Sequence, residues 1–424
     1  MSGLDRIWTL RPAVPCALGR LGGAALCGVV LAAVALAGCG DASSSGGDAS
    51  DAGAVAEPRA CLVVAAAEFG TAGGVTLVDP VTQSSRPLLT TVHHDATLTV
   101  ADDRVYVVNR AGAGGDNVQA LDVDRSLATA WQYSVGPGAN PWHLAPTGPD
   151  RAVVTRYDTA DLVAVDLTAA STDAFVVGDP VPLPSELDAD GRAEPGFVVV
   201  HDGVAWVALQ GLDDYPWCAL TSTGALVAYD AATLERRTDL GDGGVIPLRA
   251  CNPGDFALSP DGELWIAHAG NHRSLDGTGG RDTTADDGGL ELVDLAAATS
   301  LGLVLSESDF GGRDLLDLAI GADERLWVTL ANADFSVSVH PVHLTAADPI
   351  GAPVYEADGV FDLLEHDDTL WVADRTPGRS GLVAIDATTG EVRTAAPIDT
   401  GYPPVEIAVV STTARCGAAS LLAE

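Results

Sequence analysis

The sequence predicts an all-β fold: a seven-bladed β-propeller whose closing blade combines three N-terminal strands with one C-terminal strand. Two recurring strands carry this prediction. The first is aliphatic and ends in Asp: VTLVD (75–79), VQALD (118–122), LVAVD (162–166), LVAYD (226–230), LELVD (290–294) and LVAID (382–386), with SVSVH (336–340) placing His340 in the Asp position. The second lies upstream and often holds an aromatic residue: VYVV (105–108), AWVA (205–208), LWIA (264–267), LWVT (326–329) and LWVA (370–373).

A third observation gives the order of strands within a repeat. An apolar strand that runs into an acidic or Gly-containing turn precedes the aromatic strand at 256–262, 318–324 and 363–369. Each repeat therefore has strand A, a tight turn, strand B, a loop, strand C and a last strand D, such as 301–306. Alternating apolar and β-branched residues are typical of strands. Four short strands repeated seven times indicate propeller blades.

The two ends of the repeat region predict how the ring closes. Residues 61–67 form a B strand with no A strand before it, and 405–410 form an A strand with no B strand after it. One blade built from both ends leaves no free sheet edge. Cys61 and Cys416 flank this closure, where other blades have a tight turn, so we expect a disulfide between them. The cysteine count alone leaves three pairings open among Cys61, Cys218, Cys251 and Cys416.

The N-terminus carries a targeting signal. Arginines precede an apolar run over 21–37 that ends in Leu36-Ala37-Gly38-Cys39. This segment resembles the signal peptide and lipobox of bacterial lipoproteins. The resemblance implies that 1–38 is removed and that acyl chains on Cys39 anchor the protein to a membrane. The alternative is an uncleaved membrane helix, for which the run is short.

The rest of the chain divides into a linker, a propeller and a tail. Residues 39–58 begin with the lipidated Cys and continue as a flexible linker, because Gly, Ala, Ser and Asp dominate them. We expect the propeller over 59–417 and a C-terminal tail over 418–424. Gly40, rather than Asp, follows Cys39. This favours an exported protein of the outer membrane or cell surface over one retained at the inner membrane.

Charge narrows the classes of partner. The chain has 59 acidic and 22 basic residues, which gives a net charge of −37. This excludes nucleic acid as an expected ligand, because phosphate binding needs a basic surface. It is compatible with cations or basic partners. We expect a monomer that is held at the membrane by its lipid anchor and binds a protein, peptide or small molecule.

Four insertions lengthen loops of three adjacent repeats, at 180–194, 211–223, 241–253 and 270–288. Strands of a blade alternate in direction, so the D–A and B–C loops share one face, and all four insertions belong to it. Long loops on a rigid scaffold often carry function. A disulfide between Cys218 and Cys251 would join two of these insertions.

The acidic loops predict calcium as a possible cofactor. Calcium takes six to eight oxygen ligands, which acidic Gly-rich loops can supply. The alternative is a solvated acidic loop in a very acidic protein. The candidate ligands are Asp276, Asp282, Asp286 and Asp287 in one insertion and Asp188, Asp190 and Glu194 in another.

A second candidate site lies at the start of the A strands. Asp255, Asp317 and Asp362 take equivalent positions, with Glu406 equivalent by pattern and His143 nearby. A strands line the channel of a propeller, so these carboxylates could hold a cation or raise one another's pKa. The alternative is that each bonds the backbone of a neighbouring blade or a water. No nucleophile motif accompanies them.

The repeats resemble those of YVTN-type and NHL-like propellers, most closely in VYVVNRAGAGGDNVQALDVD over 105–124. The resemblance covers about 61–416. It implies the propeller architecture and leaves the chemistry open, since related propellers include lactonases and lyases, some of them metal-dependent. We therefore expect a non-catalytic binding protein of the cell envelope. The alternative is a metal-dependent hydrolase or lyase that uses the A-strand carboxylates and His143.

Overall fold

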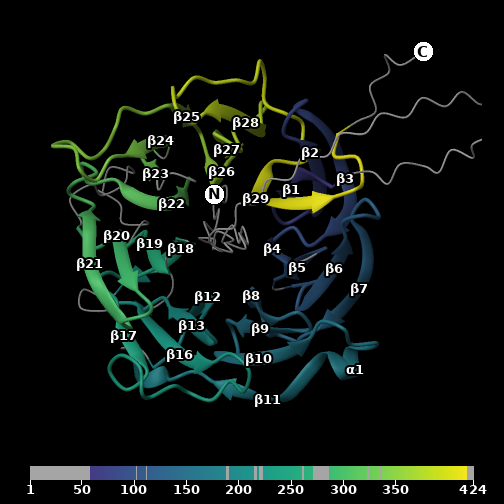
Figure 1. Ribbon diagram of the computed structural model, residues 1–424, viewed down its shortest axis with the longest axis vertical. Helices are drawn as coiled ribbons and strands as arrows, with labels where there is room; N and C mark the ends of the chain where they lie inside the picture. The colour runs from purple at the N-terminus through teal and green to yellow at the C-terminus, as the bar shows by residue number, and fades with distance from the viewer. Residues whose placement is uncertain are drawn as a thin grey trace, which may run out of the picture.

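The computed structural model describes residues 58–101, 103–110, 112–187, 191–213, 217–218, 223–259, 262–270, 286–321, 325–334 and 336–417. Within them, seven antiparallel sheets stand in a ring around the central axis of the predicted channel, with the A strands innermost (Figure 1). The seven-bladed β-propeller predicted from the repeats is therefore confirmed.

Blades 1 to 3 each have four strands. Blade 1 has β29 (Pro404–Thr412), β1 (Arg59–Glu68), β2 (Ala72–Asp79) and β3 (Ser84–Val92). Blade 2 has β4 (Ala96–Ala101), β5 (Arg104–Asn109), β6 (Asn117–Asp122) and β7 (Ala128–Ser134). Blade 3 has β8 (Pro141–Gly148), β9 (Arg151–Arg156), β10 (Asp161–Asp166) and β11 (Val176–Pro182).

Blades 4 to 7 follow the same order. Blade 4 has β12 (Pro195–His201), β13 (Val204–Leu209), β16 (Ala225–Asp230) and β17 (Val245–Pro247). Blade 5 has β18 (Pro253–Leu258), β19 (Glu263–His268), β20 (Gly289–Asp294) and β21 (Thr299–Ser306). Blade 6 has β22 (Asp314–Ile320), β23 (Leu326–Ala331), β24 (Val337–Val342) and β25 (Tyr355–Ala357). Blade 7 has β26 (Val360–His366), β27 (Thr369–Asp374) and β28 (Gly381–Asp386).

The core lies between the blades. Among the described residues, each of seven hydrophobic clusters joins mainly two adjacent blades, as when Leu62 and Val64 of blade 1 pack with Trp371 of blade 7. The B strands are buried on both faces, because each one lies inside its sheet and between two neighbouring sheets. The four tryptophans in one B-strand register, Trp206, Trp265, Trp327 and Trp371, are all buried in these interfaces.

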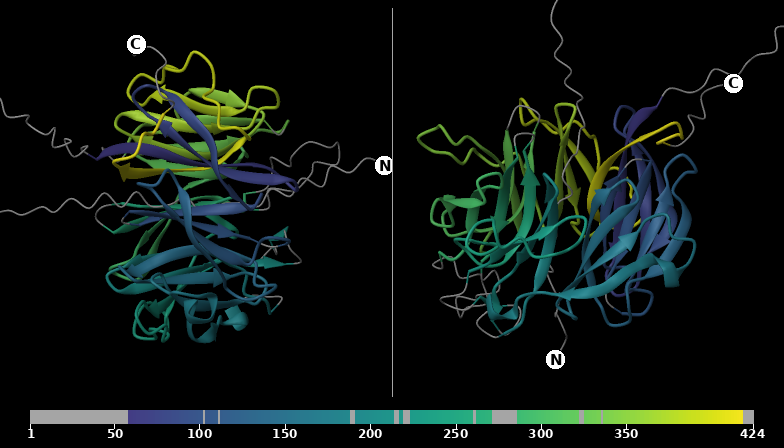
Figure 2. Two further views of the ribbon diagram at one scale, coloured as in Figure 1. Left: turned by 90° about the vertical axis from the view of Figure 1, so that its right-hand side faces the viewer. Right: turned by 60° about the horizontal axis from the view of Figure 1, so that its bottom comes forward.

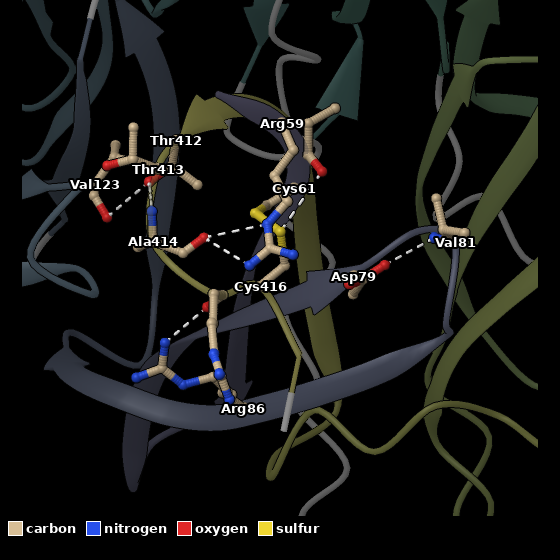
Figure 3. Close-up of a disulfide and its surroundings, with 12 residues drawn as sticks. Arg59, Cys61, Asp79, Val81, Arg86, Val123, Thr412, Thr413, Ala414 and Cys416 are labelled. Carbon is tan, nitrogen blue, oxygen red and sulfur yellow. Dashed lines mark hydrogen bonds between the residues drawn. A yellow bond between two sulfur atoms is a disulfide. The ribbon is translucent and has the colours of Figure 1, made fainter. Parts of the chain in front are cut away.

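The closing blade has the predicted composition. Strand β29 pairs antiparallel with β1, and a disulfide joins Cys61 to Cys416 with their Cα atoms 5.4 Å apart (Figure 3). The Arg59 guanidinium donates to the Ala414 carbonyl at 3.2 Å, and Arg86 Nη1 donates to the Arg415 carbonyl at 2.7 Å. Both ends of the repeat region are thereby attached to one blade, whose purple and yellow strands lie side by side (Figure 2).

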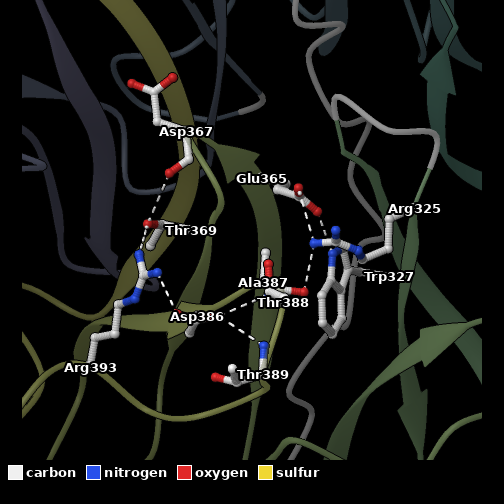
Figure 4. A network of polar contacts seen from close by, with 10 residues as sticks. All are labelled: Arg325, Trp327, Glu365, Asp367, Thr369, Asp386, Ala387, Thr388, Thr389 and Arg393. Atoms are coloured by element: carbon white, nitrogen blue, oxygen red, sulfur yellow. Dashed lines mark hydrogen bonds and ion pairs between the residues drawn. The ribbon is translucent and has the colours of Figure 1, made fainter.

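The A–B and C–D turns form one face, which we call the turn face. Here the C-strand Asp residues accept hydrogen bonds from the backbone of the turn that follows, as expected for Asp in turns. Asp386 Oδ1 accepts from the N–H groups of Thr388 and Thr389 at 2.9 and 2.8 Å, and Arg393 pairs with its other oxygen (Figure 4). The equivalent residues Asp79, Asp122, Asp166, Asp230 and Asp294 do the same.

Polar contacts between blades 6 and 7 reinforce this face. Trp327 Nε1 donates to Glu365 Oε2 at 2.5 Å, and Arg325 Nη1 lies 3.6 Å from the other Glu365 oxygen. The same guanidinium nitrogen donates to the Ala387 carbonyl at 2.6 Å (Figure 4). Adjacent blades are thus held together by buried side chains and by their turns.

The structure corrects one assignment in blade 6. The Asp that ends a C strand pairs with the B-strand residue two positions before the Trp. In blade 7, for example, Thr369 pairs with Asp386 and Trp371 follows two residues later. Trp327 pairs with Pro341, so the Asp place belongs to His343 and not to His340. The pattern SVSVH stopped too early, because β24 continues through Pro341 to Val342.

A second correction concerns the insertions. The predicted loop 241–253 contains β17, which pairs with β16 as the outer strand of blade 4. The predicted loop 180–194 begins inside β11 and includes a 3₁₀ turn (Ser185–Leu187). A hairpin of β14 (Leu212–Asp213) and β15 (Trp217–Cys218) lies in the 211–223 insertion, and α1 (Thr172–Phe175) precedes β11. No helix in the described part of the chain is both long and apolar enough to cross a membrane.

Candidate functional site

The inner ends of the A strands bring seven equivalent side chains to one level of the channel, which we call the channel ring. The B-strand residue directly after the aromatic position pairs with an A-strand residue, as in Leu98–Val107, Phe256–Ile266 and Leu363–Val372. In each blade, the ring member is the residue directly before that A-strand residue. The members are Glu406, Thr97, His143, Phe197, Asp255, Asp317 and Asp362, for blades 1 to 7 in order. All five predicted residues belong to it.

Bulges aim these side chains. In six of the seven A–B pairs the register shifts next to the ring position, for example between Pro253 and Asp255 and between Leu315 and Asp317. A bulge bends its strand and redirects the side chain beside it. Blade 2 has no such shift, and its ring residue is Thr97. The ring lies at the start of the A strands and therefore faces the D–A and B–C loops, on what we call the loop face.

Ring side chains satisfy the free edges of neighbouring blades. Leu318 N–H donates to Asp255 Oδ2 at 2.8 Å, and Ile407 N–H donates to Asp362 Oδ2 at 2.5 Å. Leu98 N–H likewise donates to Glu406 Oε2 at 2.9 Å. An A strand exposes unpaired backbone groups toward the channel, and a buried N–H without a partner is costly. The alternative considered from the sequence, a bond to the neighbouring backbone, holds for these three carboxylates.

His143 serves blade 4 in the same way. Its Nδ1 accepts from Val198 N–H at 3.2 Å, so the neutral ring carries its proton on Nε2. Burial lowers the pKa of His143 to about 4, which keeps the ring neutral at pH 7. Nε2 has no hydrogen-bond partner among the described residues, and the ring meets Phe256 edge-on with centroids 5.8 Å apart.

Asp317 departs from the pattern. Its Oδ1 accepts from Leu318 N–H in its own strand at 3.0 Å, while its Oδ2 has no hydrogen-bond partner among the described residues. Burial raises the pKa of Asp317 well above the usual range, and the charge and hydrogen bond of Asp255 and the charge of Asp362 add to this. The raised pKa favours the protonated form of Asp317 over a wider pH range than for an ordinary Asp. This is the pKa coupling considered from the sequence, carried by two neighbours instead of the whole ring.

The predicted calcium ligands are only partly described. Asp188, Asp190, Asp276 and Asp282 lie outside the described residues. Asp286 Oδ1 accepts from Ser308 N–H at 3.1 Å, and Glu194 is buried. Within the described ranges no three His, Cys, Asp or Glu side chains come together as a metal site. Calcium remains a prediction.

Sequence reasoning missed Glu307, which holds one end of the fourth insertion. Glu307 is 2% exposed and its Oε2 accepts from Asp287 N–H at 3.0 Å. Burial raises the pKa of Glu307 to about 8, with a further rise from the charge of Asp314. The sequence offers no signal for this, because Glu307 follows strand D in an ordinary acidic turn.

A buried His–Glu pair was also missed. His268 Nε2 lies 2.9 Å from Glu291 Oε2, and both side chains are fully buried. Burial would raise the pKa of Glu291, but His268 and the donors Ser300 and Arg249 outweigh it and lower the pKa. Glu291 was visible as an acidic residue inside the aliphatic strand LELVD.

The His–Glu pair adjoins the second predicted disulfide. Cys251 is disulfide-bonded, and His268 Nδ1 lies 3.3 Å from its carbonyl oxygen. The side chain of Cys218, its expected partner, lies outside the described residues. The buried pair therefore ties the third insertion to the core of blade 5.

Comparison with known proteins identifies the fold and no family. No protein-family model matches the chain, and no curated protein does. Among solved structures, the periplasmic gluconolactonase of Pseudomonas aeruginosa is similar, with 15% identity, 83% of this chain and 99% of that chain covered, and a TM-score of 0.53. A Bacteroides fragilis protein named as a candidate 6-phosphogluconolactonase has 13% identity, coverage of 86% and 100%, and a TM-score of 0.56.

A third solved structure, a protein from Lactobacillus plantarum, has 15% identity, coverage of 83% and 99%, and a TM-score of 0.52. The match covers nearly the whole length of all three solved structures, so the similarity extends over the entire ring. At these identities it shows the architecture and carries no site residue across. The chain is a seven-bladed β-propeller.

Proposed function

We propose that the protein is an exported, lipid-anchored propeller that binds a ligand without catalysis on its loop face. The observation that carries the proposal is that most polar side chains of the channel ring are used for contacts between blades. Asp255, Asp362, Glu406 and His143 are engaged in joining blades, while the lengthened D–A and B–C connections of blades 3 to 5 belong to the same face by strand direction. Long loops over a rigid ring fit a binding surface.

The N-terminal signals suggest the cellular setting of the binding face. Cys39 would hold the chain at the outer membrane or cell surface, and 39–58 would let the propeller reach away from it. A protein, peptide or small molecule is then the expected partner. Calcium in the acidic loops would order the insertions, since its oxygen ligands would come from several turns at once.

A second candidate function is lactone hydrolysis. Two unused groups in the channel ring favour it: His143 Nε2 and Asp317 Oδ2 are both buried and have no hydrogen-bond partner in the described part of the chain. A neutral His and an Asp whose pKa is raised are suitable for proton transfer to a bound oxygen. Two of the similar solved structures bear lactonase names, which makes lactones the first substrates to try.

One experiment addresses both candidates. The full chain, purified in mild detergent, is screened by thermal unfolding against calcium, small metabolites and lactones, and each stabilising compound is confirmed by calorimetry. Lactone hydrolysis is measured in the same samples. We expect saturable binding without turnover, and loss of that binding when 271–287 is replaced by a short Gly-Ser linker.

The control is Val81→Ser, which alters an exposed side chain in a C–D turn of the turn face. It should leave binding unchanged. Turnover that disappears in Asp317→Asn or His143→Gln, with folding intact, would replace the binding proposal with the hydrolase. Binding that survives both the loop replacement and these ring substitutions would place the ligand elsewhere and refute the proposal.

A further inference from the structure

A separate polar cluster lies on the loop face of blades 1 to 3, away from the insertions. His93, His94 and Asp95 form the link between β3 and β4, and Arg110 follows β5. The backbone N–H of Arg110 donates to the Asp95 carbonyl at 3.1 Å. Trp142 of β8 lies beneath the guanidinium, whose Cζ is 3.4 Å from the Trp ring centroid. Three blades thus contribute to one small region next to the channel ring.

Arg110 is buried without full compensation. Its side chain is 3% exposed, its Nη1 is 3.4 Å from Asp95 Oδ1, and its Nε has no hydrogen-bond partner among the described residues. Arg156, in the next blade, shows the contrast, because its Nε and Nη2 meet Asp161 at 2.5 and 2.6 Å. A buried charge that lacks good partners is strongly unfavourable. The guanidinium of Arg110 therefore calls for a further acceptor.

The neighbouring imidazoles have unused nitrogens as well. His93 is 8% exposed, its Nδ1 lies 2.9 Å from the Asp95 carbonyl oxygen, and its Nε2 has no partner among the described residues. The His94 ring lies 4.1 Å from the His93 ring, and its Nδ1 also lacks a partner there. Burial, together with the charge of His93, lowers the pKa of His94, while Asp95 raises it. A bound anion would accept hydrogen bonds from these nitrogen atoms and balance the charge of Arg110.

We propose that His93, His94, Arg110 and Trp142, here named the Arg110 site, bind an oxyanion, either a carboxylate or a phosphate. A guanidinium recognises such groups through parallel N–H donors. Asp95 faces Nη1 of Arg110, and Nε is the donor still without a partner among the described residues. His93 Nε2 and His94 Nδ1, which lack partners among the described residues, can donate to the ligand in the tautomer that carries the proton there. The site does not involve the insertions, so this inference and the proposed function can fail independently.

The test is anion binding to the full chain in mild detergent, with inorganic phosphate and acetate titrated separately at constant ionic strength. We expect saturable calorimetric binding and a rising Tm for at least one of them. Arg110→Met should weaken that binding at least tenfold, and Arg110→Lys should fall between, because Lys retains the charge without the fork. Arg125→Met removes an exposed Arg from a turn-face turn of blade 2 and should change nothing.

Stability without anion separates ligand binding from a purely structural role. If the Arg110–Asp95 contact were a structural ion pair, Arg110→Met would lower the Tm in anion-free buffer. We expect the Tm to hold or rise, because the substitution removes a buried charge that is only partly compensated by Asp95 and Trp142. If Arg110→Met does not fold, His93→Gln provides the affinity test. No saturable binding of either anion, or binding unaffected by these substitutions, would overturn the proposal.

Discussion

The two faces of the propeller satisfy their polar groups in different ways. On the turn face, one Asp at the end of a C strand accepts backbone hydrogen bonds from the next turn, and the device recurs in six blades. On the loop face, buried groups such as His143 Nε2, Asp317 Oδ2 and Arg110 Nε have no partner among the described residues. The turn face thus relies on one repeated local device, although Arg104 Nη1 there also lacks a partner among the described residues. The loop face instead gathers such polar atoms at and near the channel ring, where a ligand could satisfy them.

The difference indicates where selection for stability and for function act. The C-strand Asp needs only a local turn to form its hydrogen bonds, so it stabilises each of the six blades in the same way. Buried polar groups without partners lower stability unless something else returns the free energy. Substitutions on either face test this difference.

The largest effect is expected at the closure on the turn face. Cys61→Ser opens the only covalent link that joins β1 to the segment after β29 among the described residues. Removing a native disulfide typically costs about 2–5 kcal/mol. We expect a correspondingly large fall in the midpoint of urea unfolding under oxidising conditions. Cys416→Ser should have the same effect, and the double variant no more than either. Unequal single effects would mean that one Cys stabilises the fold in another way.

The channel ring should show the next largest effect. Asp362→Ala leaves Ile407 N–H buried without its acceptor, which we expect to cost about 1–3 kcal/mol of unfolding free energy. Asp362→Asn keeps an oxygen acceptor and should cost less. Urea titration of both variants measures the difference. Equal losses would show that the negative charge matters and not the hydrogen bond, which would favour a cation in the ring.

The architecture could be predicted because it is repeated. The C-strand Asp, the B-strand Trp and the split ends each follow from local periodicity and turn chemistry, and Cys61 and Cys416 mark the seam. Even so, His340 was placed wrongly by three residues, since Pro341 continues the strand where the pattern suggested an end. When one copy of a repeat is irregular, its own sequence does not show where the strand ends, and only the pairing with the B strand does.

The sites were harder to predict, for physical reasons. Asp255, Asp317 and Asp362 were found because they share a register, but their different roles depend on which N–H of the adjacent blade lies within reach. Glu307 and Arg110 owe their properties to burial by segments remote in sequence. Nothing local distinguishes them from other acidic or basic residues in loops.

A smaller effect should appear as pH dependence on the loop face. The pKa of Glu307 is raised to about 8 by burial, so the folded state retains a proton that the unfolded chain loses near 4.5. This contribution to stability is complete below pH 4.5 and declines as pH rises to about 8. One pKa unit corresponds to about 1.4 kcal/mol, so raising the pH from 6 to 7 should cost about 1 kcal/mol.

Glu307→Gln tests this directly, because the amide cannot ionise. Thermal unfolding across pH 5 to 9 should show a shallower alkaline decline in the variant than in the wild-type chain. Asp317 contributes a decline of the same sign, so Asp317→Asn is the companion variant. An unchanged slope in both would mean that these carboxyl groups are ionised and paired with a cation.

The smallest effect, of opposite sign in pH, is expected on the turn face. The hydrogen bond from Arg393 and those from the Thr389 and Thr388 N–H groups lower the pKa of Asp386. Its contribution is present above the pKa of an ordinary Asp and is lost as pH falls further, toward the lowered value. Because the Asp386 side chain is partly exposed, solvent screens its charge, and Asp386→Ala should lower the Tm only slightly at pH 7 and not at all at very low pH. The same substitution at Asp230, which accepts equivalent backbone bonds, should behave alike. If either variant lost as much stability as Asp362→Ala, the turn face would be a cooperative network and not a set of independent turns.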